Sequence, residues 1–363
     1  MLNFAIIGCG RIANKIVDGI ISNSEKAKLV AVCDILEDKM QQIKNRYIEK
    51  SNVLDEVIEV SDYKKVLEKV KIDVAIISTE SGYHEEIGLY FLENGVNLII
   101  EKPLAMSIQG AQKLVDTAKK NNLKLAASHQ NRFNYPIQLL KKAIKENRLG
   151  KIFNGMARIL WTRDDNYYLQ APWRGTWALD GGTLMNQCIH NIDLINWMMD
   201  DEIDTVYAQT SNYIRNIEAE DYGVILIRYK SGKIATIEGS AIVYPKNLEE
   251  TLTITGEKGT VVIGGMAVNK INTWRVEGDN EQEYLSIDCG DPNSVYGYGH
   301  EALYKDFIEA IEENREPLVN GVAGLNAVKI ILAAYKSQKT GKAIKFEEFN
   351  EFSTNDMKEV NIK

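Results

Sequence analysis

Asn186, His190 and Asp193 are spaced so that one helix would carry all three on a single face. His190 has an ordinary pKa of about 6.5, so it is the candidate to remove a hydroxyl proton as hydride leaves the same carbon. Asp193 could fix the tautomer of His190 or bind substrate hydroxyls. Because residues 175–199 contain no Lys, Arg or Glu, the stripe predicts a buried helix beside a polar cavity rather than a wetted surface.

Lys102 is a second candidate for proton transfer. It follows Glu101 and precedes Pro103, directly after residues 97–100, an apolar segment typical of a buried parallel strand. Ligands bind at the carboxyl ends of such strands, so we expect Lys102 to hold a substrate hydroxyl or to share its proton. A surface lysine in a loop is the alternative interpretation. Either Lys102 or His190 could be the formal base.

A glycine turn near the start of the chain indicates a nucleotide site. Gly8 and Gly10 lie between the apolar residues 4–7 and a helical segment, where a pyrophosphate can approach the helix N-terminus. Ala13 stands at the third glycine position of the pattern, which allows it. Asp34 ends a second apolar strand at the distance expected of an acid that binds ribose hydroxyls, which favours NAD over NADP.

Other polar residues follow predicted strands. Arg132, Arg163 and Arg174 are candidates for an anionic substrate group, and structural ion pairs are the alternative. His84 begins a helix, where cofactor contact and helix-start hydrogen bonding are hard to separate. The expected cofactor contacts are Gly8, Gly10, Arg11, Ile12, Asp34, Ser78, Thr79, His84, Glu101, Lys102, Gln130, Asn131, Trp173 and Arg174. The expected substrate contacts are Asn186, Asp193, Arg132, Arg163 and Arg174.

The order of expected elements predicts two domains. Strands and helices alternate through residues 1–128, which indicates a doubly wound parallel sheet. Residues 129–348 form an α+β domain with a helix over about 182–199 and a mostly antiparallel open sheet, and residues 349–363 form a polar, loosely held tail. The strands expected in that sheet cover residues 205–213, 222–229, 234–243, 250–255, 259–263 and 272–276, and helices near 300–314 and 321–339 follow. Small and apolar residues over 234–241 predict oligomerisation through the sheet's open face.

Composition bounds the class of protein. The 363 residues carry a net charge of −8 and are 45% hydrophobic, which fits a soluble globular protein and argues against nucleic-acid binding through basic patches. The four cysteines show no CxxC spacing, so we expect free thiols and no metal site. The first strand leaves no room for a cleaved leader, and no apolar run suits a membrane span, so we expect a cytoplasmic protein.

With these motifs in this order, nearly the whole chain resembles the Gfo/Idh/MocA family of NAD(P)-dependent sugar and polyol oxidoreductases. The resemblance implies a Rossmann domain followed by an antiparallel-sheet domain, dimers or tetramers through that sheet, and catalysis by Lys102 and His190. Residues 172–177 and 186–190 are similar to the corresponding segments of the family branch that oxidises C3 of UDP-N-acetylglucosaminuronate. Thr183 departs from the glycine common in that branch, and Asn186 from the aspartate of many inositol and glucose relatives.

The resemblance therefore implies hydride transfer between a sugar-ring secondary alcohol and NAD, with a nucleotide-linked sugar acid as the substrate. An inositol or free-sugar dehydrogenase is the alternative within the family. An NAD-dependent glycoside hydrolase without net redox change, and a non-catalytic NAD sensor, are the alternatives from other classes.

Overall fold

The computed structural model of the protein describes residues 1–51, 56–290 and 297–362. The chain divides into two compact units. The first comprises Met1–Met106, Gly110–Ser128 and His300–Leu325, and the second comprises Ser107–Gln109, His129–Gly299 and Asn326–Lys363. None of the described helices is long and apolar enough to cross a membrane.

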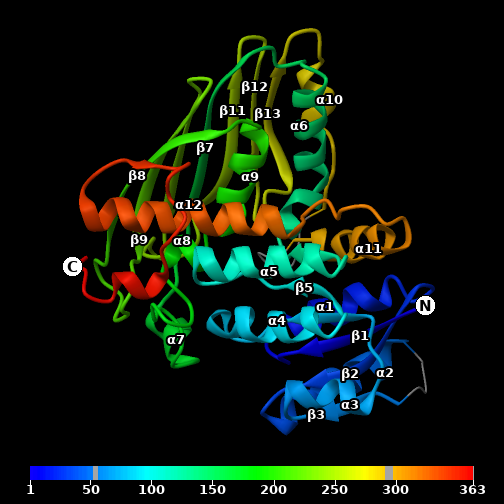
Figure 1. Cartoon of the computed structure of the whole chain (residues 1–363). Coiled ribbons are helices and arrows are strands. Elements are labelled where there is room, and N and C mark those ends of the chain that lie inside the picture. Colours follow the sequence, from blue (N-terminus) through cyan, green and yellow to red (C-terminus); the bar gives the residue numbers. More distant parts are fainter. Residues whose placement is uncertain (52–55, 291–296, 363) are drawn as a thin grey trace. The chain divides into compact units, whose positions relative to one another are not determined.

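The first unit is built on a six-stranded parallel sheet with the order β3-β2-β1-β4-β5-β6 (Figure 1). Its strands are β1 (Leu2–Ile7), β2 (Ala27–Cys33), β3 (Ile58–Val60), β4 (Val74–Ile77), β5 (Asn97–Ile100) and β6 (Leu125–Ala127). Its helices include α1 (Ala13–Ile21), α2 (Glu37–Ser51), α3 (Val66–Lys69), α4 (His84–Glu93) and α5 (Ile108–Lys120). This strand order is that of a dinucleotide-binding sheet, so the expected doubly wound parallel sheet is confirmed.

A late segment of the chain, residues 300–325, also belongs to the first unit, whereas the sequence pattern groups it with the second domain. The segment contains most of α11 (Gly299–Glu312), which packs against α1. A Cβ on Gly19 of α1 would lie 2.2 Å from the ring of Tyr304, so only glycine permits this approach. Tyr304 is 1% exposed. The segment therefore adds apolar core to the first unit.

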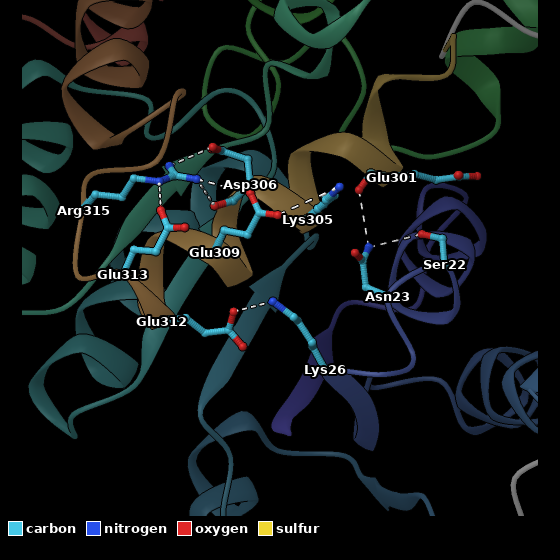
Figure 2. A network of polar contacts seen from close by, with 10 residues as sticks. All are labelled: Ser22, Asn23, Lys26, Glu301, Lys305, Asp306, Glu309, Glu312, Glu313 and Arg315. Carbon is cyan, nitrogen blue, oxygen red and sulfur yellow. Dashed lines mark hydrogen bonds and ion pairs between the residues drawn. The ribbon is translucent and has the colours of Figure 1, made fainter.

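Polar side chains around the contact between α11 and the end of α1 also interact (Figure 2). Lys26 pairs with Glu312 at 2.6 Å, and the Asn23 amide donates to the Glu301 carbonyl at 3.4 Å. Arg315 pairs with Asp306 at 2.8 Å. Ion pairs as exposed as these contribute at most about 1 kcal/mol each, so the apolar contact of Tyr304 matters more.

The second unit is built on an eight-stranded sheet with the order β13-β12-β11-β7-β10-β9-β8-β14. Its strands are β7 (Ile152–Leu160), β8 (Ile203–Ser211), β9 (Tyr222–Tyr229), β10 (Ile234–Ser240), β11 (Glu249–Gly256), β12 (Gly259–Gly264), β13 (Lys270–Val276) and β14 (Ile344–Lys345). Neighbouring strands are antiparallel except β7 and β10, which are parallel. The expected mostly antiparallel sheet is confirmed.

Helices cover one face of this sheet, and α9 lies along it in Figure 1. The helices of the second unit are α6 (Tyr135–Lys145), α7 (Asp165–Leu169), α8 (Thr183–Asn186), α9 (Ile189–Met199), α10 (Glu281–Leu285) and most of α12 (Gly321–Thr340). The single helix expected over residues 182–199 is wrong, because α8 ends at Asn186 and α9 begins only at Ile189.

The end of the chain is packed rather than loosely held. Phe352 and Met357 are buried, and the Asn212 N–H donates to the Ile362 carbonyl at 2.7 Å. The last 3₁₀ turn, Thr354–Met357, begins with a capping box at Ser353. The segment is polar in composition, but a few of its apolar side chains are buried. The expectation of a loosely held tail is therefore wrong.

Candidate functional site

The glycine turn between β1 and α1 has the geometry that a dinucleotide requires. Gly8 has φ +99°, and a Cβ there would lie 2.6 Å from the backbone of Ser78 and Thr79, so glycine is required. A Cβ on Gly10 would meet nothing within 4 Å, which leaves this backbone open to a ligand. No side chain caps the start of α1 at Ile12. The N-terminus of a helix attracts anions, so the turn fits a pyrophosphate.

Asp34 is joined to this turn. Its Oδ2 accepts a hydrogen bond from the Cys9 N–H at 2.8 Å, and its Oδ1 accepts one from the Leu36 N–H at 2.9 Å. A carboxylate accepts about four hydrogen bonds, so lone pairs remain for two ribose hydroxyls. The residues present therefore fit NAD. Of the other expected cofactor contacts in this unit, Arg11 is exposed, Thr79 and Lys102 are half-buried, and Ser78 and Glu101 are buried.

Lys102 lies between two anchored neighbours. Glu101 is buried, burial raises its pKa, and its Oε1 accepts a hydrogen bond from the Ser128 hydroxyl at 2.8 Å. On the other side of Lys102, the Pro103 carbonyl lies 2.8 Å from Nδ1 of His84. The loop after β5 therefore presents Lys102 from a fixed backbone.

Arg132 and Asp193 form a buried ion pair in the second unit. Arg132 Nε donates to Asp193 Oδ2 at 2.7 Å, and Nη2 donates to Oδ1 at 2.6 Å. The guanidinium also lies 4.8 Å from the ring centroid of Trp197. Both residues were expected to bind substrate, but the structure pairs them with each other. The structural ion pair considered as the alternative for the arginines therefore describes Arg132.

His190 is the second residue of α9 and is half-buried. The ring of His129 packs edge-to-face against it, with centroids 5.6 Å apart and an interplanar angle of 88°. His129 is 1% exposed and was not among the expected site residues. Its only sequence signal was its place directly before Gln130 at the end of the first domain.

Gln130 and Asn131 follow in a 3₁₀ turn and are buried. Within the described part of the chain, Gln130 Oε1 and Asn131 Oδ1 accept no hydrogen bond, although both are hidden from solvent. Buried amide oxygens are normally satisfied. Both atoms are therefore available to a ligand, in keeping with the cofactor contacts expected of these residues.

Asn186 ends α8 and belongs to a polar chain. Its amide nitrogen donates to Asp180, and its Oδ1 accepts from Gln187 Nε2 at 2.9 Å. Gln187 Nε2 also lies 3.0 Å from the hydroxyl of Tyr167, to which Nη1 of Arg174 donates as well. Asp180, Asn186 and Gln187 line a small cavity. The break between α8 and α9 thus places Asn186 in a polar network of its own.

Two arginines converge on Tyr167, a residue that sequence reasoning missed. The Arg174 guanidinium lies 4.2 Å from the Tyr167 ring centroid and the Arg163 guanidinium lies 5.3 Å from it. The Arg163 guanidinium also lies 4.7 Å from the ring centroid of Trp161, and the Arg174 guanidinium lies 4.7 Å from that of Trp173. Neither arginine forms an ion pair with a carboxylate of the described ranges; their bonded partners are the Thr162 carbonyl, the Asn247 amide and the Tyr167 hydroxyl.

Glu250 is the acid whose charge would act on Arg163, but burial raises the pKa of Glu250 to about 8. Its carboxyl group is therefore mostly neutral at pH 7. The two arginines concentrate positive charge that this acid does not balance. No group of three or more His, Cys, Asp or Glu residues suited to a metal ion occurs in residues 1–51, 56–290 and 297–362, and all four cysteines are free thiols.

Known proteins match both parts of the chain. Residues 2–129 match the NAD-binding Rossmann fold of the oxidoreductase family Gfo/Idh/MocA, and residues 141–346 match its C-terminal α/β domain. A curated relative is myo-inositol 2-dehydrogenase of Thermotoga maritima, 24% identical over 96% of this chain and 99% of that protein.

Two proteins of solved structure are more similar to this chain in sequence than that dehydrogenase is. The WlbA dehydrogenase of Bordetella pertussis, in complex with NADH and UDP-GlcNAcA, is 31% identical with a TM-score of 0.83 over 95% of this chain and 98% of that one. The Chromobacterium violaceum WlbA dehydrogenase, in complex with the same two ligands, is 32% identical with a TM-score of 0.85 over 95% of each chain. The chain belongs to the Gfo/Idh/MocA family of oxidoreductases and binds NAD through its Rossmann domain.

Proposed function

We propose that the protein is an NAD-dependent dehydrogenase that oxidises a secondary alcohol of a sugar ring, and that its substrate is a nucleotide-linked sugar acid oxidised at C3. The observation that carries the substrate class is the convergence of Arg163 and Arg174 on Tyr167. Two similar proteins of known structure were solved with NADH and UDP-GlcNAcA, which supports the same class.

The charge of these arginines argues for an anionic substrate. Two guanidinium groups on one ring repel each other, and the neutral carboxyl of Glu250 offers no compensation. A carboxylate or phosphate would accept hydrogen bonds from both groups and remove the repulsion. Arg132 differs from these two arginines, because its guanidinium already pairs with the carboxylate of Asp193. A neutral inositol would leave the two charges uncompensated.

The chemistry we assign to the chain is the handling of one hydroxyl proton. NAD, when bound, accepts the hydride from the carbinol carbon. The imidazole of His190 or the amine of Lys102 takes the hydroxyl proton as that hydride leaves, and the other group hydrogen-bonds the oxygen. We assign the orientation of a neighbouring hydroxyl to Asn186, whose side chain bonds to Asp180 and Gln187. Gly8, Gly10 and Asp34 hold the cofactor.

Nicotinamide absorbance tests this function. The purified protein is mixed with NAD and, separately, with a UDP-linked sugar acid, with the matching neutral UDP-sugar, with myo-inositol and with free glucose. We expect reduction of NAD with the sugar acid at a kcat/KM at least tenfold above the others. Reduction with inositol alone would overturn the substrate class, and release of a glycoside without net reduction would favour the hydrolase alternative.

We further infer that two copies of the chain associate through the open face of the second sheet. Residues paired in register form a row across that face. The row runs from β8 to β12 through Tyr207, Leu226, Thr236, Met156, Thr253 and Val262. Tyr207, Leu226 and Met156 are 38%, 44% and 45% exposed, which is an unusual apolar surface for a face left in water.

Light scattering on wild-type protein and on Leu226→Glu tests the association. We expect a dimer or larger oligomer for the wild type and a smaller species for the variant, because a buried charge opposes pairing. A monomeric wild type at micromolar concentration would contradict the proposed association.

Four free cysteines also fit a reducing compartment, which supports a cytoplasmic location.

A further inference from the structure

The imidazole of His84 connects two loops of the first unit. Nδ1 lies 2.8 Å from the carbonyl oxygen of Pro103, and Nε2 lies 3.2 Å from that of Thr79. His84 is the first residue of α4 and only 1% exposed. Both ring nitrogens face backbone oxygens, so neither is left to contact a cofactor directly.

The loop on the Thr79 side, which follows β4, packs against the glycine turn. The backbone of Ser78 and Thr79 lies against Gly8 so closely that a side chain there would collide with it. The Ser78 hydroxyl donates to the Gly8 carbonyl at 2.7 Å, and the Ser78 N–H donates to the Ile7 carbonyl at 2.8 Å. This side of the bridge is therefore fixed to β1 independently of His84.

The loop on the Pro103 side carries Lys102. Upstream of the lysine, the Glu101 N–H donates to the Ile77 carbonyl at 2.8 Å and the Glu101 side chain accepts from Ser128. Downstream, the Pro103 carbonyl meets His84. The lysine backbone is thus held on both sides, and His84 supplies the link that leads back to the cofactor turn.

We propose that His84 is a positioning residue, which sets the Lys102 backbone relative to the glycine turn through its hydrogen bond to the Pro103 carbonyl. The proposal rests on the proposed function, in which Lys102 handles the substrate proton. A shift of about 1 Å in such a group costs up to roughly 100-fold in rate, so a single buried imidazole can control turnover without touching the substrate.

The protonation state of the imidazole agrees with this role. Burial lowers the pKa of His84, and the charge of Lys102 acts in the same direction. A neutral imidazole has one N–H group, and the shorter contact assigns that hydrogen to Nδ1, toward Pro103. Nε2 then carries a lone pair and donates nothing to the Thr79 carbonyl, so the one hydrogen bond that the neutral imidazole donates lies on the Lys102 side.

Asn97 offers a matched control. It joins the same sheet at the opposite ends of the strands, because its amide donates to the Asp73 carbonyl at 3.0 Å and its Oδ1 accepts from the Lys124 N–H at 2.9 Å. Asn97→Ala removes two side-chain hydrogen bonds to backbone, one more than the single bond that the neutral His84 donates, and it does so far along the strands from Lys102. A purely structural role for His84 predicts equal effects of the two substitutions on kcat.

The experiment measures kcat, KM and NADH affinity for His84→Ala, His84→Gln and Asn97→Ala in the full-length protein, with thermal unfolding as the check on folding. We expect kcat to fall about 10- to 100-fold in His84→Ala, with NADH affinity changed less than threefold because Ser78 still holds the turn. His84→Gln keeps an N–H donor and should recover part of kcat. Asn97→Ala should keep kcat within twofold of wild type.

Wild-type kcat in both folded His84 variants, or an equal loss of kcat in Asn97→Ala, would overturn the proposal. Lys102→Ala separates this failure from that of the proposed function. Full turnover in Lys102→Ala would sink the proposed function itself, whereas an inactive Lys102→Ala beside a fully active His84→Ala would reject only the role of His84.

Discussion

Arg132 and Asp193, 61 residues apart in the sequence, meet in a bidentate ion pair with side chains 8% and 1% exposed. The pair joins the 3₁₀ turn after the first sheet to α9, the helix that carries His190. Considered separately in the sequence, each residue was expected to bind substrate. Together they satisfy each other, so their contribution is to hold the His190 helix in place.

Removing one partner of this pair should be costly. Asp193→Ala leaves the buried Arg132 charge without the carboxylate that pairs with it, and we expect a loss of about 3–5 kcal/mol in the free energy of unfolding. Urea denaturation measures it. The exposed pair of Lys26 and Glu312 (Figure 2) is the control, and Glu312→Gln should change stability by less than about 1 kcal/mol. An Asp193→Ala protein as stable as Glu312→Gln would contradict this reading of the pair.

The stability contributed by Glu220 and Glu250 should decline as pH rises from about 4.5 to 8. Burial raises the pKa of Glu220 and of Glu250 to about 8. Over this range the unfolded chain loses protons that the folded chain keeps, so the stability present below the unfolded pKa is lost as pH passes the folded one.

Urea midpoints at pH 5.5 and pH 8.5 test this decline. Glu220→Gln and Glu250→Gln should each show a smaller fall than the wild type, because the amide does not ionise. The Glu220 substitution keeps an acceptor for the Leu184 N–H and the Tyr335 hydroxyl, which both donate to Oε1. A fall of equal size in wild type and variants would place the titrating groups elsewhere.

Asp34 should decide the choice between NAD and NADP. Its charge repels a 2′-phosphate, and its free lone pairs suit ribose hydroxyls. Asp34→Asn keeps an oxygen for the Cys9 N–H, so the turn should survive. We expect kcat/KM for NAD to fall about 10- to 100-fold and the preference over NADP to narrow. A wild type that uses NADP better than NAD would refute this assignment.

The arginines on Tyr167 should set the charge of the substrate. Arg174→Gln and Arg163→Gln should each raise KM for the sugar acid about 10- to 100-fold, the value of a lost charged hydrogen bond, while NADH affinity stays constant. Tyr167→Phe keeps the ring and should have a smaller effect. Arg315→Gln in the first unit is the control, since Arg315 pairs with Asp306 and Glu313. Equal KM values in all variants would remove the anion site.

Local patterns predicted much of the fold. The glycine turn, Asp34 and the alternation of apolar strands with helices describe the first sheet because each depends on residues close in sequence. The central strand β7 escaped prediction. Its Gly155 weakens the strand pattern, yet glycine suits the position, since a Cβ would lie 2.5 Å from the end of the Ile195 side chain of α9, which would then have to shift. A close helix approach is a tertiary constraint that no local pattern reveals.

The site was predictable only in part, because local spacing does not reveal contacts between distant segments. Asn186 and His190 were singled out by spacing, but the spacing assumed one helix where the chain has two. The pairing of Arg132 with Asp193, the gathering of two arginines on Tyr167 and the bridge from His84 to Pro103 all join distant segments. Such contacts follow from topology rather than from periodicity.

The central claim is that Lys102 and His190 handle the proton of a hydride-transfer reaction. The most direct measurement is nicotinamide absorbance with UDP-GlcNAcA for wild type, Lys102→Ala and His190→Ala, after NADH titration has shown that all three bind the cofactor equally. We expect reduction by the wild type and a fall of about 10²- to 10⁴-fold in kcat for each variant. Normal turnover in both variants would contradict the account.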